Sequence, residues 1–535
     1  MGTLNPQKTL GAYYTREPVA RAIVRWAVRR PGDAVLDPSC GDGVFLSSAV
    51  CHLTDIGSAN PKVWGVDVNA EVVGAARPCL PECRVLSGDF FSIKPGDLPV
   101  FDAVIGNPPF IRYQAFNGSS RLAALARAAE AGVRLTELAS SWAPFLIHST
   151  AFLAKGGRLG MVVPAELGHA RYAKEVISFL VQKFRRIQFC IFRKKLFPEL
   201  SEDTGLLFCE GFGDACTWFS IAVLRDVRDI EQQSYVQRPV NIEAVRSGLV
   251  RLGHYLLSPR VLQLYDRLRE HEEVVSAGAV ADVGIGYVSG CNDYFHLPFR
   301  ERREWCIPES FLKPALLSLG ATEYLVLRKP DWKSLLDAGE KVYLLAVPPI
   351  NHKLLPQSIQ RYLEHGVGLG LPERFKCRTR KPWYSVPHVR VADAFLSYMS
   401  GQAPRLAKNA CKLVAPNTLH LVRCGGRKRT LGFLGGWHSS LTRLSCELEG
   451  HALGGGMLKL EPSEAERVLV PFPSSQRRET GFIGRLDAAM RADGDAAAAE
   501  LADHHVLRSG LGLSATECAL LRDGAAEMQE WRLHE

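Results

Sequence analysis

Four short apolar segments in the first 110 residues each end at a polar side chain, and this recurrence constrains the fold more than any other feature. The segments end at Asp37, Asp67, Asp89 and Asn107. Each has the length of a short buried strand. Because open α/β sheets bind their ligands at the carboxyl ends of the strands, the four polar residues are predicted to lie along one edge of a sheet.

The fourth segment leads into I-G-N-P-P-F at residues 105–110, where the strand cannot continue. Two prolines fix φ and remove backbone donors, so this loop is stiff. The side-chain carbonyl of Asn107 and the backbone carbonyl of Pro108 can together accept both hydrogens of one exocyclic amino group. Phe110 offers a flat ring on which the group that carries this amine can stack. Such a tetrapeptide alone is usually only a turn, but the upstream acids favour methylation of an amino group on a planar base.

The upstream segments predict the site of a nucleoside-containing ligand. Thr15 is predicted to cap a helix, and the glycine loop after Asp37 lets the backbone pass close to a ligand before the next helix begins. An acid at this point favours a cationic group, such as the amino group of a methionine moiety, over a pyrophosphate. Asp67 stands where an acid commonly accepts ribose hydroxyls. Asp89 can accept from an adenine amino group, and Phe90 can pack on its ring.

Composition limits the domain number, the compartment and the kind of partner that the chain can have. A chain of 535 residues is too long for one ordinary core, so two large domains are predicted. The 47% hydrophobic and 23% charged content is that of a soluble globular protein, and no apolar run reaches the ~18 residues that span a bilayer. The 14 cysteines are scattered, which favours a reduced cytoplasmic protein without a structural metal. The net charge of +9 permits a polyanionic partner without establishing one.

Taken together, the motifs resemble a known family. The chain is similar over roughly residues 8–170 to the gamma group of adenine-specific DNA amino-methyltransferases, the restriction-modification enzymes with an N-P-P-F motif. One departure is Arg16, where the family often has proline. The motifs that carry the resemblance follow in the family's order: G-A-Y-Y-T at 11–15, D-P-S-C-G-D-G-V-F-L at 37–46, G-V-D at 65–67, G-D-F-F at 88–91 and G-N-P-P-F at 106–110.

The resemblance implies a fold and a cofactor. The fold is α/β, a Rossmann-like methyltransferase sheet of about seven strands, mostly parallel but mixed, followed by an α+β DNA-recognition domain. The cofactor is S-adenosylmethionine, with Tyr13 and Thr15 at its methionine end and Pro109 near its methyl-bearing sulfonium. The implied cofactor-binding residues are Tyr13, Thr15, Asp37, Ser39, Cys40, Gly41, Asp67, Asp89, Phe90 and Pro109.

The implied reaction is direct methylation of an adenine that has been flipped out of duplex DNA. The catalytic loop is Asn107, Pro108, Pro109 and Phe110, and the everted base would stack on Phe110. Phe197 occupies the place of a second aromatic that closes on the base, although a core phenylalanine is an equally good interpretation. Carbon methylation of cytosine is disfavoured, because Cys40 lies in the cofactor loop rather than in the N-P-P-F loop.

The second half of the chain contains fewer recognisable motifs. We predict a catalytic domain over residues 1–230 and a target-recognition domain with a helical C-terminal tail over residues 231–535, joined by a polar segment at 226–235. Residues 283–295 are similar to the segment that opens recognition domains in this family. A basic segment, K-C-R-T-R-K-P-W-Y at 376–384, either contacts DNA or is a solvated loop with a buried tryptophan. Its candidate DNA contacts are Arg378, Arg380, Lys381 and Trp383.

Three functions therefore remain under comparison. The first is a site-specific adenine-N6 methyltransferase acting on double-stranded DNA in a prokaryotic cytoplasm, with a possible cognate restriction endonuclease or defence-system partner. The second is an amino-methyltransferase of protein glutamine or ribosomal RNA, whose members are usually much shorter. The third is a cofactor-bound DNA-binding subunit of a defence complex, against which the intact N-P-P-F motif counts.

Overall fold

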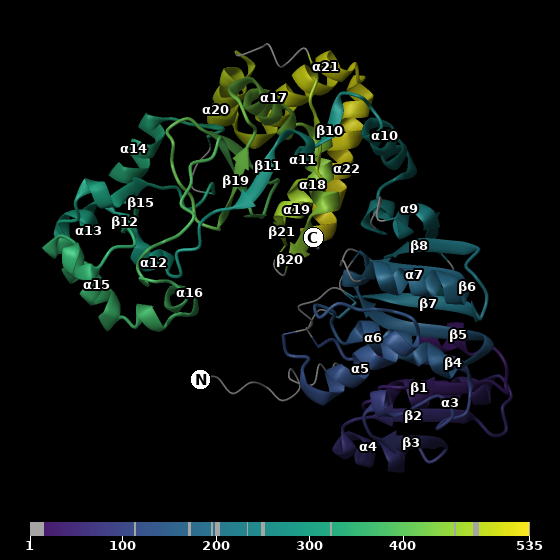
Figure 1. Ribbon diagram of the computed structural model, residues 1–535. Helices are drawn as coiled ribbons and strands as arrows, with labels where there is room; N and C mark the ends of the chain where they lie inside the picture. The colour runs from purple at the N-terminus through teal and green to yellow at the C-terminus, as the bar shows by residue number, and fades with distance from the viewer. Residues whose placement is uncertain are drawn as a thin grey trace. The chain divides into compact units, whose positions relative to one another are not determined.

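The computed structural model shows two compact units, the first reaching Leu256 and the second covering Leu257–Leu533 (Figure 1). The first unit therefore ends 26 residues after the predicted boundary at 230, because the segment predicted as a linker contains a helix and leads into a strand of the first sheet. The structure describes residues 15–111, 114–168, 173–193, 196–197, 204–232, 234–247, 252–320, 324–453, 456–474 and 481–533.

The first unit is built on one mixed sheet with the strand order β3-β2-β1-β4-β5-β7-β6-β8-β9. It has nine strands rather than the expected seven or so, because β8 pairs in parallel with β6 and β9 pairs with β8. β7 lies antiparallel between β5 and β6. The strands are β1 (Ala34–Asp37), β2 (Lys62–Asp67), β3 (Cys83–Ser87), β4 (Phe101–Gly106), β5 (Leu153–Pro164), β6 (Phe184–Phe192), β7 (Thr204–Phe212), β8 (Trp218–Leu224) and β9 (Val236–Pro239).

Helices cover both faces of this sheet (Figure 1). The predicted amphipathic helix is α2, and it packs closely on β5 because Gly160 has no side chain. A Cβ atom at Gly160 would lie 2.9 Å from Cγ2 of Ile23. The helices of the unit are α2 (Glu17–Ala27), α3 (Val44–Asp55), α4 (Ala70–Ala76), α5 (Gly118–Glu130), α6 (Trp142–Ser149), α7 (Ala173–Lys183), α8 (Arg228–Gln232) and α9 (Ile242–Arg246).

The second unit is α+β. Its central sheet has the order β11-β19-β16-β18-β14, and three small sheets join β12-β15-β13, β17-β21-β20 and β10-β22. The strands are β10 (Val274–Ser276), β11 (Asp282–Ile285), β12 (His296–Pro298), β13 (Leu312–Pro314), β14 (Val326–Leu327), β15 (Lys341–Leu345), β16 (Ala394–Ser397), β17 (Met399–Ser400), β18 (Leu406–Asn409), β19 (Leu419–Arg423), β20 (His451–Leu453), β21 (Met457–Lys459) and β22 (Leu469–Pro471).

The helices of the second unit include the helical C-terminal tail that the sequence predicts. This tail belongs to the core of the unit, since the buried Arg532 pairs with Glu447 at 3.0 Å and the buried Asp503 accepts the backbone N–H of Ser440 at 2.7 Å. The helices are α10 (Pro259–Arg269), α11 (Ala277–Val280), α12 (Asn292–Phe295), α13 (Phe299–Glu304), α14 (Lys329–Asp337), α15 (Gln357–Gly368), α16 (Phe375–Arg378), α17 (Arg427–Trp437), α18 (Ser440–Glu449), α19 (Pro462–Ala465), α20 (Phe482–Ala502), α21 (Ser509–Leu511) and α22 (Ala515–Leu533).

Two general properties complete the description. Among the helices that the structure describes, none is both long enough and apolar enough to cross a bilayer. Over the same residues, no three His, Cys, Asp or Glu side chains are grouped so that they could share a metal ion.

Candidate active site

The carboxyl ends of the parallel strands bring three of the predicted residues together. β1 pairs in parallel with both β2 and β4, so Asp37, Asp67 and Asn107 follow neighbouring strands at one edge. The hydroxyl of Ser39 donates to the backbone carbonyl of Asn107 at 3.1 Å, and the N–H of Gly41 donates to Oδ2 of Asp67 at 2.8 Å. The loop after β1 is therefore bonded both to the end of β2 and to the Asn-Pro-Pro-Phe loop after β4.

Asp37 is the most deeply buried acid of this edge, with no measurable exposure. Its Oδ1 accepts the N–H of Ser39 at 3.0 Å, while its Oδ2 has no hydrogen-bond partner among the described residues. A side chain at position 106 would clash with it, since a Cβ atom on Gly106 would lie 2.7 Å from Oδ1. Burial raises the pKa of Asp37 well above its usual value, and the nearby Asp67 raises it further. Such a carboxylate calls for a cationic partner.

Cys40 is packed into the glycine loop rather than presented to a ligand. Its N–H donates to the carbonyl of Val66 at 2.9 Å, and a Cβ atom on Gly65 would lie 3.0 Å from its sulfur. Burial, followed by the charges of Asp37 and Asp67, raises the pKa of the Cys40 thiol far above its usual value. The thiol is therefore neutral at physiological pH and cannot act as a nucleophile.

Asp67 and Asp89 are half-buried and already oriented by backbone donors. Oδ1 of Asp67 accepts the N–H of Asn69 at 2.9 Å, and Oδ1 of Asp89 accepts the N–H of Phe91 at 2.9 Å. Oδ2 of Asp89 also accepts the hydroxyl of Ser120, from α5, at 3.1 Å. Each carboxylate has about four lone-pair positions, so both keep capacity to accept from a ligand.

The ring of Phe90 does not face this edge, contrary to the expectation that it packs on adenine. Phe90 is 3% exposed and its ring lies 5.0 Å from that of Phe145, 4.7 Å from that of His148 and 5.2 Å from that of Phe152. A short 3₁₀ turn at 90–92, capped by Asp89, directs the ring into the core. Phe90 can therefore contribute only its backbone to a ligand at this site.

The Asn-Pro-Pro-Phe loop is held from outside by three polar side chains. The Nδ2 of Asn107 donates to the hydroxyl of Thr15 at 3.2 Å. The backbone carbonyl of Asn107 accepts the hydroxyl of Ser39, and that of Pro109 accepts the hydroxyl of Ser141. The carbonyl of Pro108, between them, accepts no hydrogen bond from any described residue. The prediction that Thr15 caps α2 is wrong, because Arg16 occupies that position and the Thr15 hydroxyl bonds Asn107 instead.

The two aromatic residues that are predicted to stack on the base are both buried. Phe110 is 9% exposed, at the end of the loop. Phe197 is 1% exposed, which matches the alternative interpretation of a core phenylalanine. Tyr13, the remaining residue of the predicted cofactor site, lies outside the described residues.

The candidate DNA contacts of the basic segment at 376–384 fall into two groups, exposed cations and side chains that face the unit. Arg378 and Lys381 are exposed and make no ion pair with the described residues. Arg380 instead turns inward, where its guanidinium donates to the carbonyl of Ser289 at 2.8 Å and to that of Val288. Trp383 is half-buried, with its ring 6.0 Å from that of Tyr294. Arg380 thus attaches the segment to residues 288 and 289, and contact of Arg380 and Trp383 with DNA stays a prediction.

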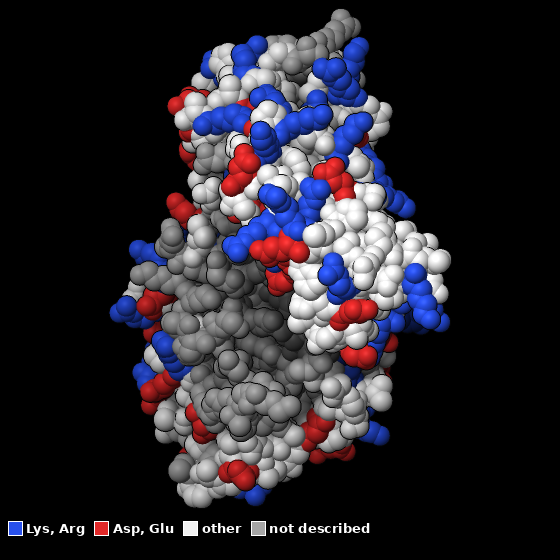
Figure 2. Space-filling view, turned by 90° about the vertical axis from the view of Figure 1, so that its left-hand side faces the viewer, with Lys and Arg blue, Asp and Glu red and all other residues white. Residues whose placement is uncertain are grey.

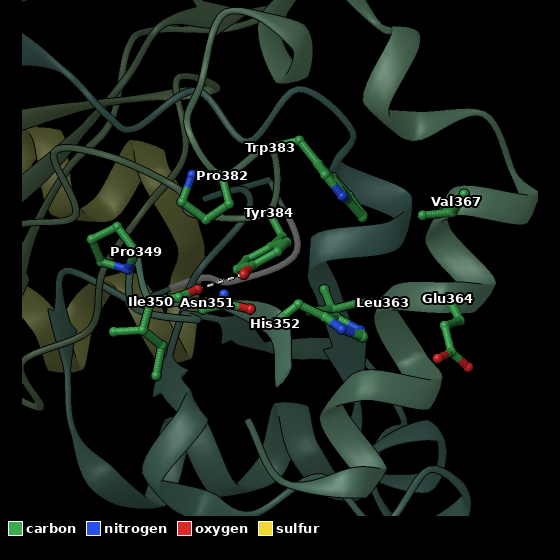
Figure 3. Close-up of a pocket in the computed structure, with 10 residues that line it drawn as sticks. All are labelled: Pro349, Ile350, Asn351, His352, Leu363, Glu364, Val367, Pro382, Trp383 and Tyr384. Atoms are coloured by element: carbon green, nitrogen blue, oxygen red, sulfur yellow. Dashed lines mark hydrogen bonds between the residues drawn. The ribbon is translucent and has the colours of Figure 1, made fainter. Parts of the chain in front are cut away.

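Trp383 also lines a pocket of about 580 Å³ within the second unit (Figure 3). Tyr384 stands beside it, and its hydroxyl donates to the carbonyl of Ile350 at 2.6 Å. Tyr384 is thus buried, whereas the half-buried Trp383 lines the pocket. Figure 2 shows Lys and Arg side chains gathered mainly in the upper half of the viewed face.

Two residues at the site carried no recognised sequence signal. Ser120 and Ser141 bond Asp89 and the Asn-Pro-Pro-Phe loop, respectively, but Ser120 lies in an alanine- and arginine-rich stretch and Ser141 follows it, with no motif at either position. Ser141 directly precedes an apolar helix, a position at which serine commonly caps the helix. Its side chain makes no such cap, and only the folded chain reveals the alternative use.

The strand order, the antiparallel β7 and the polar strand ends define a Rossmann-like methyltransferase. Residues 3–208 match the N-6 DNA methylase family, and residues 251–507 match the C-terminal domain of the type II methyltransferase M.Eco57I. The chain therefore joins an N-6 DNA methylase domain to a C-terminal domain like that of the type II methyltransferase M.Eco57I. It is a DNA adenine methyltransferase.

Curated relatives and a solved structure extend over most of the chain. The type II methyltransferase M.AccI of Acinetobacter calcoaceticus is 21% identical over 78% of this chain and 77% of its own length. M.XamI of Xanthomonas campestris pv. amaranthicola is 22% identical over 86% and 85%, respectively. The type IIL restriction-modification enzyme MmeI, solved in complex with DNA, has a TM-score of 0.54 at 11% identity over 96% of this chain and 75% of its own, which shows a shared fold.

Proposed function

We propose that the protein is the site-specific modification enzyme of a restriction-modification or phage-defence system. It transfers the methyl group of S-adenosylmethionine directly to the 6-amino group of an adenine flipped out of double-stranded DNA. It works in the cytoplasm of a prokaryotic cell, where its DNA is found, alone or beside a cognate endonuclease. The matches to the N-6 DNA methylase family and to the type II C-terminal domain support this assignment.

The observation that carries the reaction is the set of carbonyls in the Asn-Pro-Pro-Phe loop. The Asn107 and Pro109 carbonyls are each occupied by a serine hydroxyl, whereas the Pro108 carbonyl accepts nothing from the described residues. The bond from Nδ2 to Thr15 fixes the direction in which the Asn107 amide points, with its oxygen as an acceptor. The Pro108 carbonyl and the Asn107 amide oxygen are thus the pair that would receive the two hydrogens of the target amine.

The cofactor assignment is supported by the donor set around the loop after β1. When bound, S-adenosylmethionine supplies a methyl group on a sulfonium, which is already an activated leaving group. The buried Asp37, with Oδ2 unpartnered among the described residues, suits the ammonium of its methionine part. Asp67 and Asp89 would accept from its ribose and its adenine amine, and Gly41 and Ser39 hold the loop that approaches it.

The chain's own residues then act by positioning and electrostatics. Hydrogen bonds from the amine to Asn107 and Pro108 would pull its nitrogen towards a tetrahedral shape and aim its lone pair. Phe110 would support the everted base by stacking. The neutral, buried Cys40 offers no nucleophile, which supports a direct transfer without a covalent enzyme intermediate.

DNA would be bound by exposed cations of the second unit. Arg378 and Lys381 make no ion pair with the described residues, whereas Arg300 on α13 is already paired with Glu304 at 2.8 Å. Cations without an acidic neighbour are the ones that gain most from neutralising phosphates. Phe375 is 62% exposed beside Arg378, whose guanidinium carbon lies 5.4 Å from the centre of its ring, and Nζ of Lys376 lies at 5.3 Å. Such a side chain can pack on sugars or bases.

The decisive experiment compares methyl acceptors. The full chain is incubated with S-adenosylmethionine labelled on the methyl group and, separately, with unmodified genomic DNA, total RNA and cell protein. We expect label in DNA, and sequencing of that DNA should place 6-methyladenine at one recognition sequence. Label in RNA or in protein glutamine instead would replace the proposed function with the second alternative.

A further inference from the structure

The loop that would hold the target amine cannot fix its own shape. Neither Pro108 nor Pro109 has an N–H, so two consecutive residues cannot donate to neighbouring backbone. A turn without donors depends on outside groups to set the directions of its carbonyls. On the upstream side Ser39, which belongs to the loop after β1, donates to the carbonyl of Asn107 at 3.1 Å.

On the downstream side a single residue makes three bonds. Ser141 donates its hydroxyl to the carbonyl of Pro109, and the same oxygen accepts the N–H of Ile111 at 2.8 Å. Its own N–H donates to the carbonyl of Ile111 at 3.0 Å. Ser141 is 1% exposed, so no water replaces these bonds from bulk solvent.

The element that carries Ser141 is rigid. All eight residues of α6, from Trp142 to Ser149, are buried. Ser141 precedes the first of them, and its hydroxyl leaves the helix uncapped and bonds the loop instead. The Ser141 side chain therefore bonds the loop about 30 residues upstream in place of capping its own helix.

We propose that Ser141 is a positioning residue for methyl transfer, a role that rests on the proposed function. By holding the Pro109 carbonyl and the Ile111 N–H, it turns the Pro108 carbonyl to the amine and fixes the start of the Phe110 platform. It touches neither cofactor nor base. Its loss would therefore slow the transfer step while leaving Asp37, Asp67 and their bonds to the loop after β1 intact.

The test uses the full chain with Ser141→Ala, Ser141→Cys and the matched control Ser149→Ala. Ser149 is a buried serine of the same helix whose hydroxyl donates to the carbonyl of Phe145 at 2.8 Å, away from the loop. The thiol of the second variant nearly preserves volume but is a weak donor, so it separates lost bonding from lost packing. Single-turnover methyl transfer to unmodified genomic DNA is measured, with cofactor affinity and melting temperature for each protein.

We expect Ser141→Ala and Ser141→Cys to lower the transfer rate roughly tenfold to a hundredfold, the size of effect that a small misplacement of reacting groups causes. Cofactor affinity should stay within about twofold of wild type, and Ser149→Ala should keep the wild-type rate. Each transfer rate is divided by the concentration of cofactor-binding sites. A variant that is only unstable therefore shows fewer binding sites but an unchanged rate per site.

Failure of this role is distinguishable from failure of the proposed function. If the wild-type chain transfers no methyl to DNA, the proposed function falls and the role of Ser141 with it. If the wild-type chain methylates DNA and both Ser141 variants match Ser149→Ala in rate, only the role of Ser141 is overturned. The Cys variant decides if the Ala variant does not fold.

Discussion

The strand edge of the first unit and the basic segment of the second both hold predicted contact residues, yet they fold by different rules. At the strand edge, Asp37, Asp67 and Asn107 all reach one site. In the basic segment, Arg378 and Lys381 face solvent while Arg380 turns inward. Parallel pairing forces the carboxyl ends of β1, β2 and β4 to one edge, whereas the short helix and turn at 376–384 impose no shared direction.

A motif fixes where its side chains point only when regular secondary structure surrounds it. A polar residue directly after a buried parallel strand inherits its position from the whole sheet, so its neighbours are known before the fold is seen. A charged residue in an irregular turn takes its direction from local bonds that the sequence does not reveal. The two regions should therefore respond differently to substitution, with loss of function at the strand edge and a division into binding and stability effects in the basic segment.

The largest effect is expected for Asn107→Ala at the strand edge. Removing one acceptor of the target amine should lower the transfer rate by about 100- to 1,000-fold, the usual cost of losing one preorganised polar contact in a transition state. Cofactor affinity should change little, since the carboxylates remain. Single-turnover transfer of labelled methyl to DNA measures the rate, and calorimetric titration measures the affinity.

The matched control for this prediction is Asn117→Ala. Asn117 is exposed and its side chain does not cap α5, so its loss should leave the rate unchanged. Wild-type methylation by Asn107→Ala in the assembled system would mean that catalysis resides in another subunit. The protein would then be the DNA-binding subunit of a defence complex.

Asp37→Asn should have the next largest effect. It should stabilise the folded chain but weaken cofactor binding. Burial raises the pKa of Asp37 in the folded chain above its unfolded value. The folded state then holds this proton more tightly than the unfolded state, so stability is lost as pH rises through the folded pKa. The Asn variant lacks that loss, and we expect it to gain about 0.5–2 kcal/mol at neutral pH.

Cofactor binding should move the other way. An ammonium partner favours ionised Asp37, so wild-type affinity for S-adenosylmethionine should increase as pH rises, and Asp37→Asn should lose about 10- to 100-fold, as for a hydrogen bond to a charged group. Thermal melting and calorimetric titration across weakly acidic to neutral pH measure both quantities. Equal affinity of the two proteins would place the cofactor's ammonium elsewhere.

These residues also show which features of the site the sequence predicts and which it does not. The strand ends and the N-P-P-F loop could be predicted, because an apolar run followed by a polar residue is a local pattern and parallel pairing supplies the rest. The inward ring of Phe90 could not, since a 3₁₀ turn reverses its direction. Thr15 and Ser141 bond the loop across 92 and 32 residues of sequence, respectively, and no local pattern encodes such contacts.

The smallest effects are expected in the basic segment, where exposed and inward cations should behave differently. Arg378→Ala and Lys381→Ala should each weaken DNA binding by about three- to tenfold and reduce the slope of log affinity against log salt by about 1 per removed phosphate contact. Arg380→Ala should leave that slope unchanged and instead lower the melting temperature, since the carbonyls of Val288 and Ser289 lose their donor. Fluorescence anisotropy with a labelled duplex at several salt concentrations measures the slope.

Arg300→Ala is the matched control for the exposed pair. Arg300 is as exposed as they are but is neutralised by Glu304, so its removal should change neither the slope nor the affinity appreciably. If Arg380→Ala reduces the slope as much as Arg378→Ala does, the inward guanidinium must swing out to meet phosphate. The basic segment would then behave as one binding surface, and the contrast between the two regions would disappear.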